Sequence, residues 1–254
     1  MTGLAFGGAL VVSQYVSAGP DTSDATPAGA PSTAASVPDA SVPGTSVPAT
    51  SVPEGADSAA SEEPTAHAPS DPAVVALATL EALTEVSGDS AWEYRRDAFG
   101  EPWEDVDGNG CSTRNDILAR DLDDPEFASD QCKVLAGTLV DPYDGRIVPF
   151  VFGQQTSQEV PIDHVVALAW AWRHGADRWG PERRLVFAND PQNLQAVAQE
   201  NNQRKLAKGP AQWLPADAGR SCVYVERWVS VLAAYDLGIN AADRATARTV
   251  LERC

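Results

Sequence analysis

The fold of this chain is best predicted from the stretch Pro161-Ile162-Asp163-His164-Val165-Val166, because the other motifs are interpreted by their order relative to it. It is an apolar, extended segment that contains a carboxylate directly before a histidine. Asp163 offers a hard oxygen ligand for a cation, and His164 offers a neutral base on the adjacent residue. Taken alone, an Asp-His pair is more typical of a structural histidine, so its meaning depends on the segments that follow it.

Two asparagine-containing motifs follow this pair. They are Asn189-Asp190-Pro191-Gln192-Asn193-Leu194 and Asn201-Asn202-Gln203-Arg204-Lys205. The order Asp-His, Asn-Leu and Asn-x-x-Lys resembles that of the HNH nucleases. More specifically, the sequence resembles the secreted HNH endonuclease family of actinobacteria, which is related to the C-terminal domain of GmrSD-type restriction enzymes. The matching stretches lie within residues 94–254 and are Phe99-Gly100, Trp103, 107–118, Asp141-Pro142-Tyr143, 163–168, 187–190, 202–205 and Trp213-Leu214-Pro215.

The resemblance implies a ββα-metal finger, in which a β-hairpin carries Asp163 and His164 and packs on a helix that offers Asn202. One divalent ion, Mg²⁺ with Mn²⁺ as the alternative, would bind a phosphate oxygen and neutralise developing charge. Asp163 and Asn202 would be its ligands, and His164 would be the general base. Asn193 would hold the loop of His164 by side-chain hydrogen bonds. Lys205, one helical turn after Asn202, would meet the phosphate.

The chain departs from the family pattern at two positions. The family has Ala-Asp-Ala-Trp after the Asp-His strand, whereas this chain has Ala169-Trp170-Ala171-Trp172. The family also has glycine after the last lysine, where this chain has Leu206. Because the histidine and both asparagines are kept, we expect catalysis to be retained; a degenerate, inactive member is the alternative.

A second acidic segment has the spacing of an EF-hand loop, in which positions 1, 3, 5 and 12 bring oxygens onto one calcium ion. These positions are Asp105, Asp107, Asn109 and Asp116. The aspartate at position 12 is shorter than the usual glutamate, and a bridged Cys111 would constrain the loop. Two alternatives to a Ca²⁺ site stay open: Arg114 grips a phosphate in the active-site cleft, or the segment is a structural turn.

The rest of the folded region predicts a small hairpin among helices. Strand-like runs at 133–140 and 146–152 flank the turn sequence Asp141-Pro142-Tyr143-Asp144-Gly145. Helical patterns cover 72–83, 113–122, 165–173, 191–206 and 223–237. In the first of these, the apolar stripe is Val74, Leu77, Leu80 and Leu83. The predicted class is α+β, with the finger embedded in a mainly helical domain.

Four cysteines suggest two disulfides, because their number is even and the chain has features of an exported protein. Three pairings are possible, and we favour Cys111–Cys132 with Cys222–Cys254, which close the shortest loops. A zinc site is the alternative, but the sequence has no CxxC pair to support it.

The sequence of residues 1–70 has features that predict export of the protein from the cell. Residues 1–18 read as a signal peptide, with small residues at Val16-Ser17-Ala18, although no basic residue precedes the apolar stretch. Residues 19–70 read as a disordered linker rich in Pro, Ala, Ser and Thr, in which Ser-Val-Pro recurs with a five-residue period. Residues 71–254 are the predicted endonuclease domain. We expect no transmembrane span in the mature chain.

The charge distribution limits how the chain can bind nucleic acid. The formal net charge is −18, and the first 70 residues contain no lysine or arginine. Eight acids precede Pro72, so 28 acids and 18 bases remain after it. This field disfavours a wide coating surface, because such binding relies on cations that displace counterions from phosphates. A focal site is not excluded, since residues 163–209 hold seven bases against five acids.

These features predict a secreted or envelope-associated, metal-dependent endonuclease of low sequence specificity, which acts on DNA rather than RNA. No zinc finger, helix-turn-helix or other base-reading module is recognisable. We expect a monomer without a stable protein partner. The alternative is non-enzymatic: an exported, calcium-stabilised envelope module whose HNH motif is inert.

Overall fold

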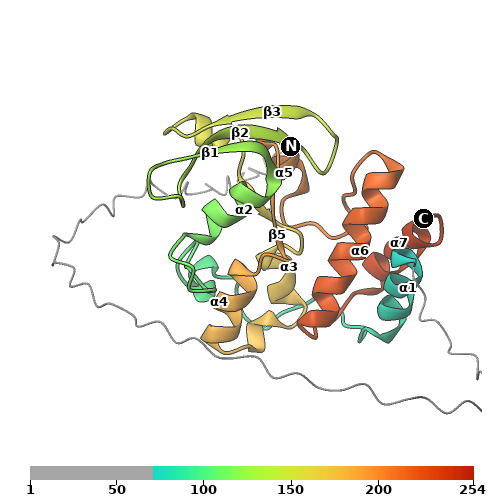
Figure 1. Ribbon diagram of the computed structural model, residues 1–254. Helices are drawn as coiled ribbons and strands as arrows, with labels where there is room; N and C mark the ends of the chain where they lie inside the picture. Colours follow the sequence, from blue (N-terminus) through green and yellow to red (C-terminus); the bar gives the residue numbers. More distant parts are fainter. Residues whose placement is uncertain (1–70) are drawn as a thin grey trace, which may run out of the picture. The chain divides into compact units, whose positions relative to one another are not determined.

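The computed structural model describes residues 71–254 (Figure 1). The predicted signal peptide at 1–18 and the predicted linker at 19–70 lie outside the described residues. The helices are α1 (Pro72–Ala82), α2 (Thr113–Asp121), α3 (Leu168–Arg173), α4 (Pro181–Asn189), α5 (Gln199–Lys205), α6 (Ala218–Ala234) and α7 (Ala241–Leu251). The strands are β1 (Leu122–Phe127), β2 (Val134–Val140), β3 (Ile147–Val151), β4 (Ile162–His164) and β5 (Leu194–Ala196). The 3₁₀ helices are η1 (Arg96–Phe99), η2 (Thr156–Gln158) and η3 (Ala176–Arg178). The predicted α+β class is confirmed.

Two small antiparallel sheets make up the β structure. One has the order β1-β2-β3, and the other pairs β4 with β5. The predicted hairpin is confirmed: β2 pairs with β3, and the amide of Gly145 donates to the carbonyl of Asp141 in the turn between them. Strand β1 was not predicted, because it contains Pro125 and three acidic residues, which are unusual in strands.

Two hydrophobic clusters stabilise the described domain, and β4 passes between them. Ile162 belongs to the smaller cluster, which α2 and the three-stranded sheet contribute to. Val165 and Val166 belong to the larger cluster, which is mainly helical. Figure 1 shows β5, the partner of β4, between α2 and α6. The polar pair Asp163 and His164 is therefore fixed on both sides by buried apolar residues.

Helix α1 packs against α6 and α7 at the end of the domain away from the three-stranded sheet (Figure 1). Its start is as predicted, because the side chain of Asp71 accepts a hydrogen bond from the amide of Ala73 and Pro72 is the first helical residue. The predicted apolar stripe is wrong at Val74, which is 47% exposed. The smaller Ala73 and Ala76 face the core instead, so the helices approach closely.

Both predicted disulfides are present. Cys111 and Cys132 join the segments before α2 and before β2, with their Cα atoms 5.2 Å apart. Cys222 in α6 and Cys254 after α7 join the last two helices, with a Cα separation of 5.8 Å. All four cysteines lie among the described residues, and none is free to bind zinc.

Several helix predictions were only partly right. Residues 191–206 are one predicted helix, but the structure forms β5 and then α5 there. The predicted helix at 165–173 begins only at Leu168, and α4 and α7 were not predicted. Within residues 71–254, no helix has the length and apolar character that crossing a membrane requires.

Candidate active site

Strands β4 and β5 and the following helix α5 gather most of the predicted site residues. Asp163 and His164 are the last two residues of β4, opposite Gln195 and Leu194 of β5. Lys205 is the last residue of α5, and its ammonium donates to the main-chain carbonyl of His164 at 2.7 Å. A two-stranded antiparallel sheet followed by a helix thus brings both ends of the motif together, although 41 positions separate them in the chain.

Asn193 fixes the main chain immediately after His164. Its Oδ1 accepts from the amide of Val166 at 2.8 Å, and its Nδ2 donates to the carbonyl of the same residue at 3.3 Å. The amide of Val165 donates to the carbonyl of Asn193 at 2.7 Å. Because Asn193 is fully buried, these bonds hold the loop of His164 without competition from water. The contribution of Asn193 to catalysis remains a prediction.

His164 is half-buried, and its ring lies against the last turn of α4. Nε2 lies 2.9 Å from the carbonyl oxygen of Ala188, so Nε2 carries the proton and donates it. Nδ1 is then the acceptor nitrogen. Burial lowers the pKa of His164 to about 3, and the positive charges of Arg96 and Lys205 contribute to the same effect. The ring is therefore neutral near pH 7, which a general base requires.

Asp163 lies in a buried polar cluster with Lys205 and Tyr143. The ammonium of Lys205 lies 3.1 Å from Oδ2 and 3.3 Å from Oδ1 of Asp163. The hydroxyl of Tyr143 donates to Oδ2 at 2.6 Å. Burial and the charge of Asp163 raise the pKa of Tyr143 well above its ordinary value, so the phenol stays protonated. In this arrangement Lys205 contacts the protein itself, whereas the resemblance placed it on the phosphate.

The oxygen donors expected to bind a divalent ion differ in how open they are. Both carboxylate oxygens of Asp163 accept hydrogen bonds, one from Tyr143 and one from Lys205, and the ammonium of Lys205 lies within 3.3 Å of both oxygens. The role of Asp163 as an ion ligand stays a prediction. Asn202 is half-buried, and its side-chain amide has no hydrogen bond to residues 71–254. Across the same residues, no three His, Cys, Asp or Glu side chains are grouped so that they could hold a metal ion.

Two arginines that the sequence did not single out clamp the loop that contains Asn193. Arg120 of α2 donates to the carbonyls of Pro191 and Leu194, both at 2.7 Å. Arg227 of α6 donates to the same two carbonyls at 2.9 and 2.8 Å. Burial and the charge of Arg120 lower the pKa of Arg227 below its ordinary value. Both arginines are distant in the chain from this loop, so no local pattern pointed to them.

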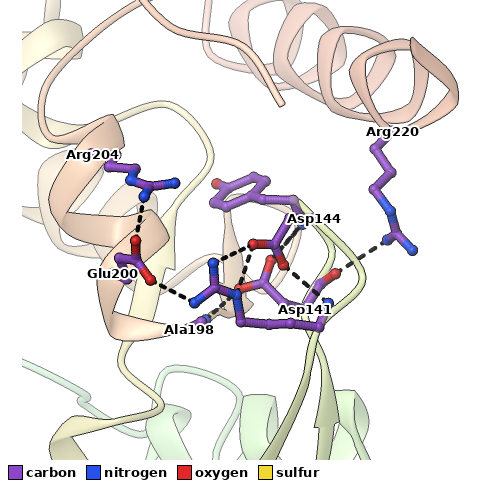
Figure 2. A network of polar contacts seen from close by, with 8 residues as sticks. Asp141, Asp144, Ala198, Glu200, Arg204 and Arg220 are labelled. Atoms are coloured by element: carbon purple, nitrogen blue, oxygen red, sulfur yellow. Dashed lines mark hydrogen bonds and ion pairs between the residues drawn. The ribbon is translucent and has the colours of Figure 1, made fainter. Parts of the chain in front are cut away.

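The turn between β2 and β3 is bonded to the start of α5 and to α6 (Figure 2). Oδ2 of Asp141 accepts from the amide of Ala198, the residue before α5, at 2.5 Å. The carbonyl of Asp141 accepts from Arg220 of α6 at 3.1 Å. Arg146 of the turn and Glu200 of α5 form an ion pair at 2.6 Å. These contacts set the position of α5 and hence of Asn202.

The predicted calcium loop closes on itself through its own backbone. The carboxylate of Asp105 accepts from the amides of Gly108, Asn109 and Gly110. The side-chain amide of Asn109 donates to Asp107 and to Asp116, each at 3.2 Å. Burial raises the pKa of Asp116, to which the charges of Asp107 and Asp105 add. These carboxylates do not form a metal-holding group in the described residues.

The remaining predicted residues contact the protein main chain or the core. Nη2 of Arg114 donates to the carbonyls of Ser157 and Val160, each at 3.1 Å, and so supports the segment that leads into β4. Trp170, which replaces an acid of the family pattern, is buried and stacks on His174 with ring centroids 3.5 Å apart. Its indole donates to Asp243 at 3.0 Å.

Most bases of the 163–209 segment are also bound within the protein. Arg173 donates to Ala207, Arg183 to Tyr235, Arg184 to Ala98 and Trp179, and Lys208 to Arg204, in each case to a main-chain carbonyl. Arg204 pairs with Glu200, and Lys205 with Asp163. The excess of bases in this segment is therefore largely structural.

Comparison with known proteins gives one family and one curated relative. A family model described as "GmrSD restriction endonucleases, C-terminal domain" matches residues 112–243. A protein of the fungus Arthroderma benhamiae (strain ATCC MYA-4681 / CBS 112371), named "Uncharacterized secreted protein", is 34% identical over 163 residues, which cover 63% of this chain and 76% of the relative. No solved structure matches the chain significantly.

Proposed function

Because the chain belongs to the family of GmrSD restriction endonuclease C-terminal domains, which suggests a nuclease, we propose that it hydrolyses phosphodiester bonds of nucleic acid as an endonuclease. The proposed substrate is DNA rather than RNA, with low sequence specificity. The observation that supports this most is a neutral histidine at the end of β4, in the two-stranded sheet, where a buried asparagine holds the loop that follows it.

In the proposed reaction, Nδ1 of His164 accepts a proton from the attacking water. Nε2 cannot do so while it donates to Ala188. The pKa of His164 is about 3 without substrate, and the negative charge of a nearby phosphate would raise it toward the working pH. Asn193 positions the ring by fixing the adjacent main chain, and Lys205 does so by binding the carbonyl of His164.

We propose dependence on a divalent ion, Mg²⁺ with Mn²⁺ as the alternative, which would supply charge neutralisation at the phosphate. The support is the open amide of Asn202, since a neutral amide oxygen is a hard donor suited to either ion. Asp163 contributes as a ligand only if Lys205 leaves it. Under the arrangement described above, Asp163 instead neutralises Lys205.

The proposed place of action is outside the cell or at the cell envelope. The curated relative is named a secreted protein, and two disulfides are typical of extracellular proteins. The predicted signal peptide and a monomeric state belong to the same proposal.

A plasmid-nicking assay tests the proposed function. Supercoiled plasmid is incubated with the full chain in Mg²⁺, Mn²⁺, Ca²⁺ or excess EDTA, and single-stranded RNA serves as the competing substrate. We expect nicked and linear DNA with Mg²⁺ or Mn²⁺ and none with EDTA or with His164→Ala. If no divalent ion supports cleavage of DNA or RNA, the inert calcium-stabilised module becomes the better explanation.

A further inference from the structure

Arg96 is an exposed arginine whose charge is not neutralised by the described part of the chain. It is the first residue of η1, and its guanidinium forms no hydrogen bond or ion pair with residues 71–254. Its neighbour Arg95, in contrast, makes a two-point contact with Asp97. Arg95, the residue before η1, and Arg96, its first residue, therefore differ in whether their side-chain donors are in use.

The element that carries Arg96 is firmly attached to the core. Phe99 of η1 is fully buried, and its ring lies 6.3 Å from that of Phe187 in α4. Nε of Arg184, also in α4, donates to the carbonyl of Ala98 at 2.8 Å. Arg96 thus projects from a support that does not need to reorganise when a ligand binds.

The same helix α4 contacts the proposed general base. The carbonyl of Ala188, in the last turn of α4, accepts the Nε2 proton of His164 at 2.9 Å. η1 packs along α4 through Phe99 and Ala98, so Arg96 and His164 lie beside one helix. Phe187, which Phe99 contacts, directly precedes Ala188 in α4, so η1 and the ring of His164 contact adjacent residues of this helix.

We propose that Arg96 binds a non-bridging oxygen of the phosphate that His164 acts on, or of the phosphate next to it. This inference rests on the proposed function. A guanidinium offers a planar fork of donors that matches two phosphate oxygens. The bases of 163–209 named above are bound to carbonyls and carboxylates of the protein, whereas Arg96 has its donors available. A cation beside the base also compensates the negative charge of the substrate.

The test compares Arg96→Ala and Arg96→Lys with Arg95→Ala, a matched control one residue away in the chain. Each change is made in the full chain and also in a His164→Ala background, in which a duplex oligonucleotide can be bound without cleavage. Fluorescence anisotropy gives Kd at several salt concentrations between about 50 and 200 mM, over which the loss of phosphate contacts changes affinity strongly. The nicking assay gives kcat and KM.

For Arg96→Ala we expect Kd to rise about tenfold and the negative slope of log Kobs against log[salt] to become less negative by about one. Arg96→Lys should recover the salt slope but only part of the affinity, because an ammonium lacks the planar fork. Arg95→Ala should match the parent in both. An unchanged Kd and salt slope in Arg96→Ala, or an equal loss in Arg95→Ala, would overturn the inference.

The two proposals fail in different ways. If the wild-type chain binds the duplex but does not nick DNA, the proposed function is lost while the comparison of Arg96 with Arg95 still decides the inference. If the chain nicks DNA and Arg96→Ala nicks it with unchanged KM and kcat, the inference is lost and the proposed function stands. A chain that neither binds nor cleaves contradicts both.

Discussion

The ammonium of Lys205 lies 3.1 Å from Oδ2 of Asp163, and the two side chains are 0% and 7% exposed. A buried pair of this kind is costly to break, because removal of one partner leaves the other charge without solvent or counter-charge. Because Lys205 also donates to the carbonyl of His164, the pair helps to hold the end of β4 in place.

Replacing one member of the Asp163–Lys205 pair should lower the free energy of unfolding more than replacing both members. Lys205→Met and Asp163→Asn should each lower the free energy of unfolding by about 3–5 kcal/mol. The double variant should be more stable than the sum of these losses predicts, since no charge is left unpaired. Urea unfolding of all four proteins gives the coupling energy. Additive losses would show that Asp163 and Lys205 do not depend on each other.

The roles of His164 and Asn202 should separate in activity and ion binding. His164→Ala should lower the nicking rate by about 10²–10⁴, the usual contribution of a positioned base, with ion affinity nearly unchanged. Asn202→Ala should weaken the binding of Mg²⁺ or Mn²⁺ in calorimetric titration and lose activity as a consequence. Ion binding that survives in Asn202→Ala, or disappears in His164→Ala, would reverse this assignment.

Asn193→Ala provides the intermediate case. It should lower the nicking rate by displacing His164, and leave ion binding in place, because its amide contacts only the main chain of Val166. The melting temperature distinguishes this from general loss of structure. A fall in melting temperature that tracks the loss of activity in each of the three alanine variants would favour purely structural roles.

Leu206 has a strained backbone conformation that glycine would relieve. Its φ is +51°, in the region that L side chains rarely adopt, and its side chain is 44% exposed. Leu206→Gly should therefore stabilise the protein by about 1 kcal/mol. Leu206→Ala keeps the Cβ atom and serves as the control without the gain. Thermal unfolding of the three proteins compares them, and a destabilised glycine variant would show that the leucine side chain outweighs the strain.

His174 should make the stability fall in mild acid. Burial lowers its pKa, and Nε2 lies 3.1 Å from the side-chain nitrogen of Asn240, which leaves no acceptor for a second proton. Below about pH 6.5 the unfolded chain binds a proton at this histidine that the folded chain does not. The stability contributed by neutral His174 is therefore complete above that pH and decreases as the pH falls. Between pH 7 and 5, the free energy of unfolding should therefore fall less for His174→Gln than for wild type. An equal loss, measured by denaturant unfolding at both pH values, would contradict this.

The link between α6 and the segment after α7 should contribute to stability by restricting the unfolded chain. Replacing Cys222 and Cys254 together with serine should cost about 3 kcal/mol. Mass spectrometry of the unreduced protein should detect no free thiol, with a peptide that joins these two cysteines. Replacing Cys111 and Cys132 separately provides a comparison, because the disulfide between them closes a shorter loop, with a sequence separation of 21.

Structural elements with a local sequence pattern were predictable, and so were the two disulfides, which close the shortest loops. The hairpin of β2 and β3 has strand-like runs and a turn sequence, and α1 has a cap followed by proline. The helix expected at 191–206 was wrong because β5 is short and buried on both faces, so it lacks the alternation that distinguishes a strand. Helices α4 and α7 did have start signals, namely Pro181 and the cap Asn240, which pattern reading overlooked.

The site was predictable in its motif residues but not in their supports. The order of Asp163, His164, Asn193 and Lys205 carried the resemblance, and the structure places them around β4, β5 and α5. Tyr143, Arg120 and Arg227 reach the same region through folding from positions 20 or more residues away. Lys205 pairs with Asp163 instead of pointing toward solvent, where it could meet a phosphate. This pairing depends on the burial of both side chains, which the motif does not encode.

The two-arginine clamp has a consequence for the order of events during synthesis. The loop with Asn193 precedes α6 in the chain, yet its carbonyls require Arg227 of that helix as well as Arg120 of α2. A nascent chain that lacks α6 would therefore hold this loop through Arg120 without Arg227. The support of the main chain beside His164 would therefore be completed only after α6 has been synthesised.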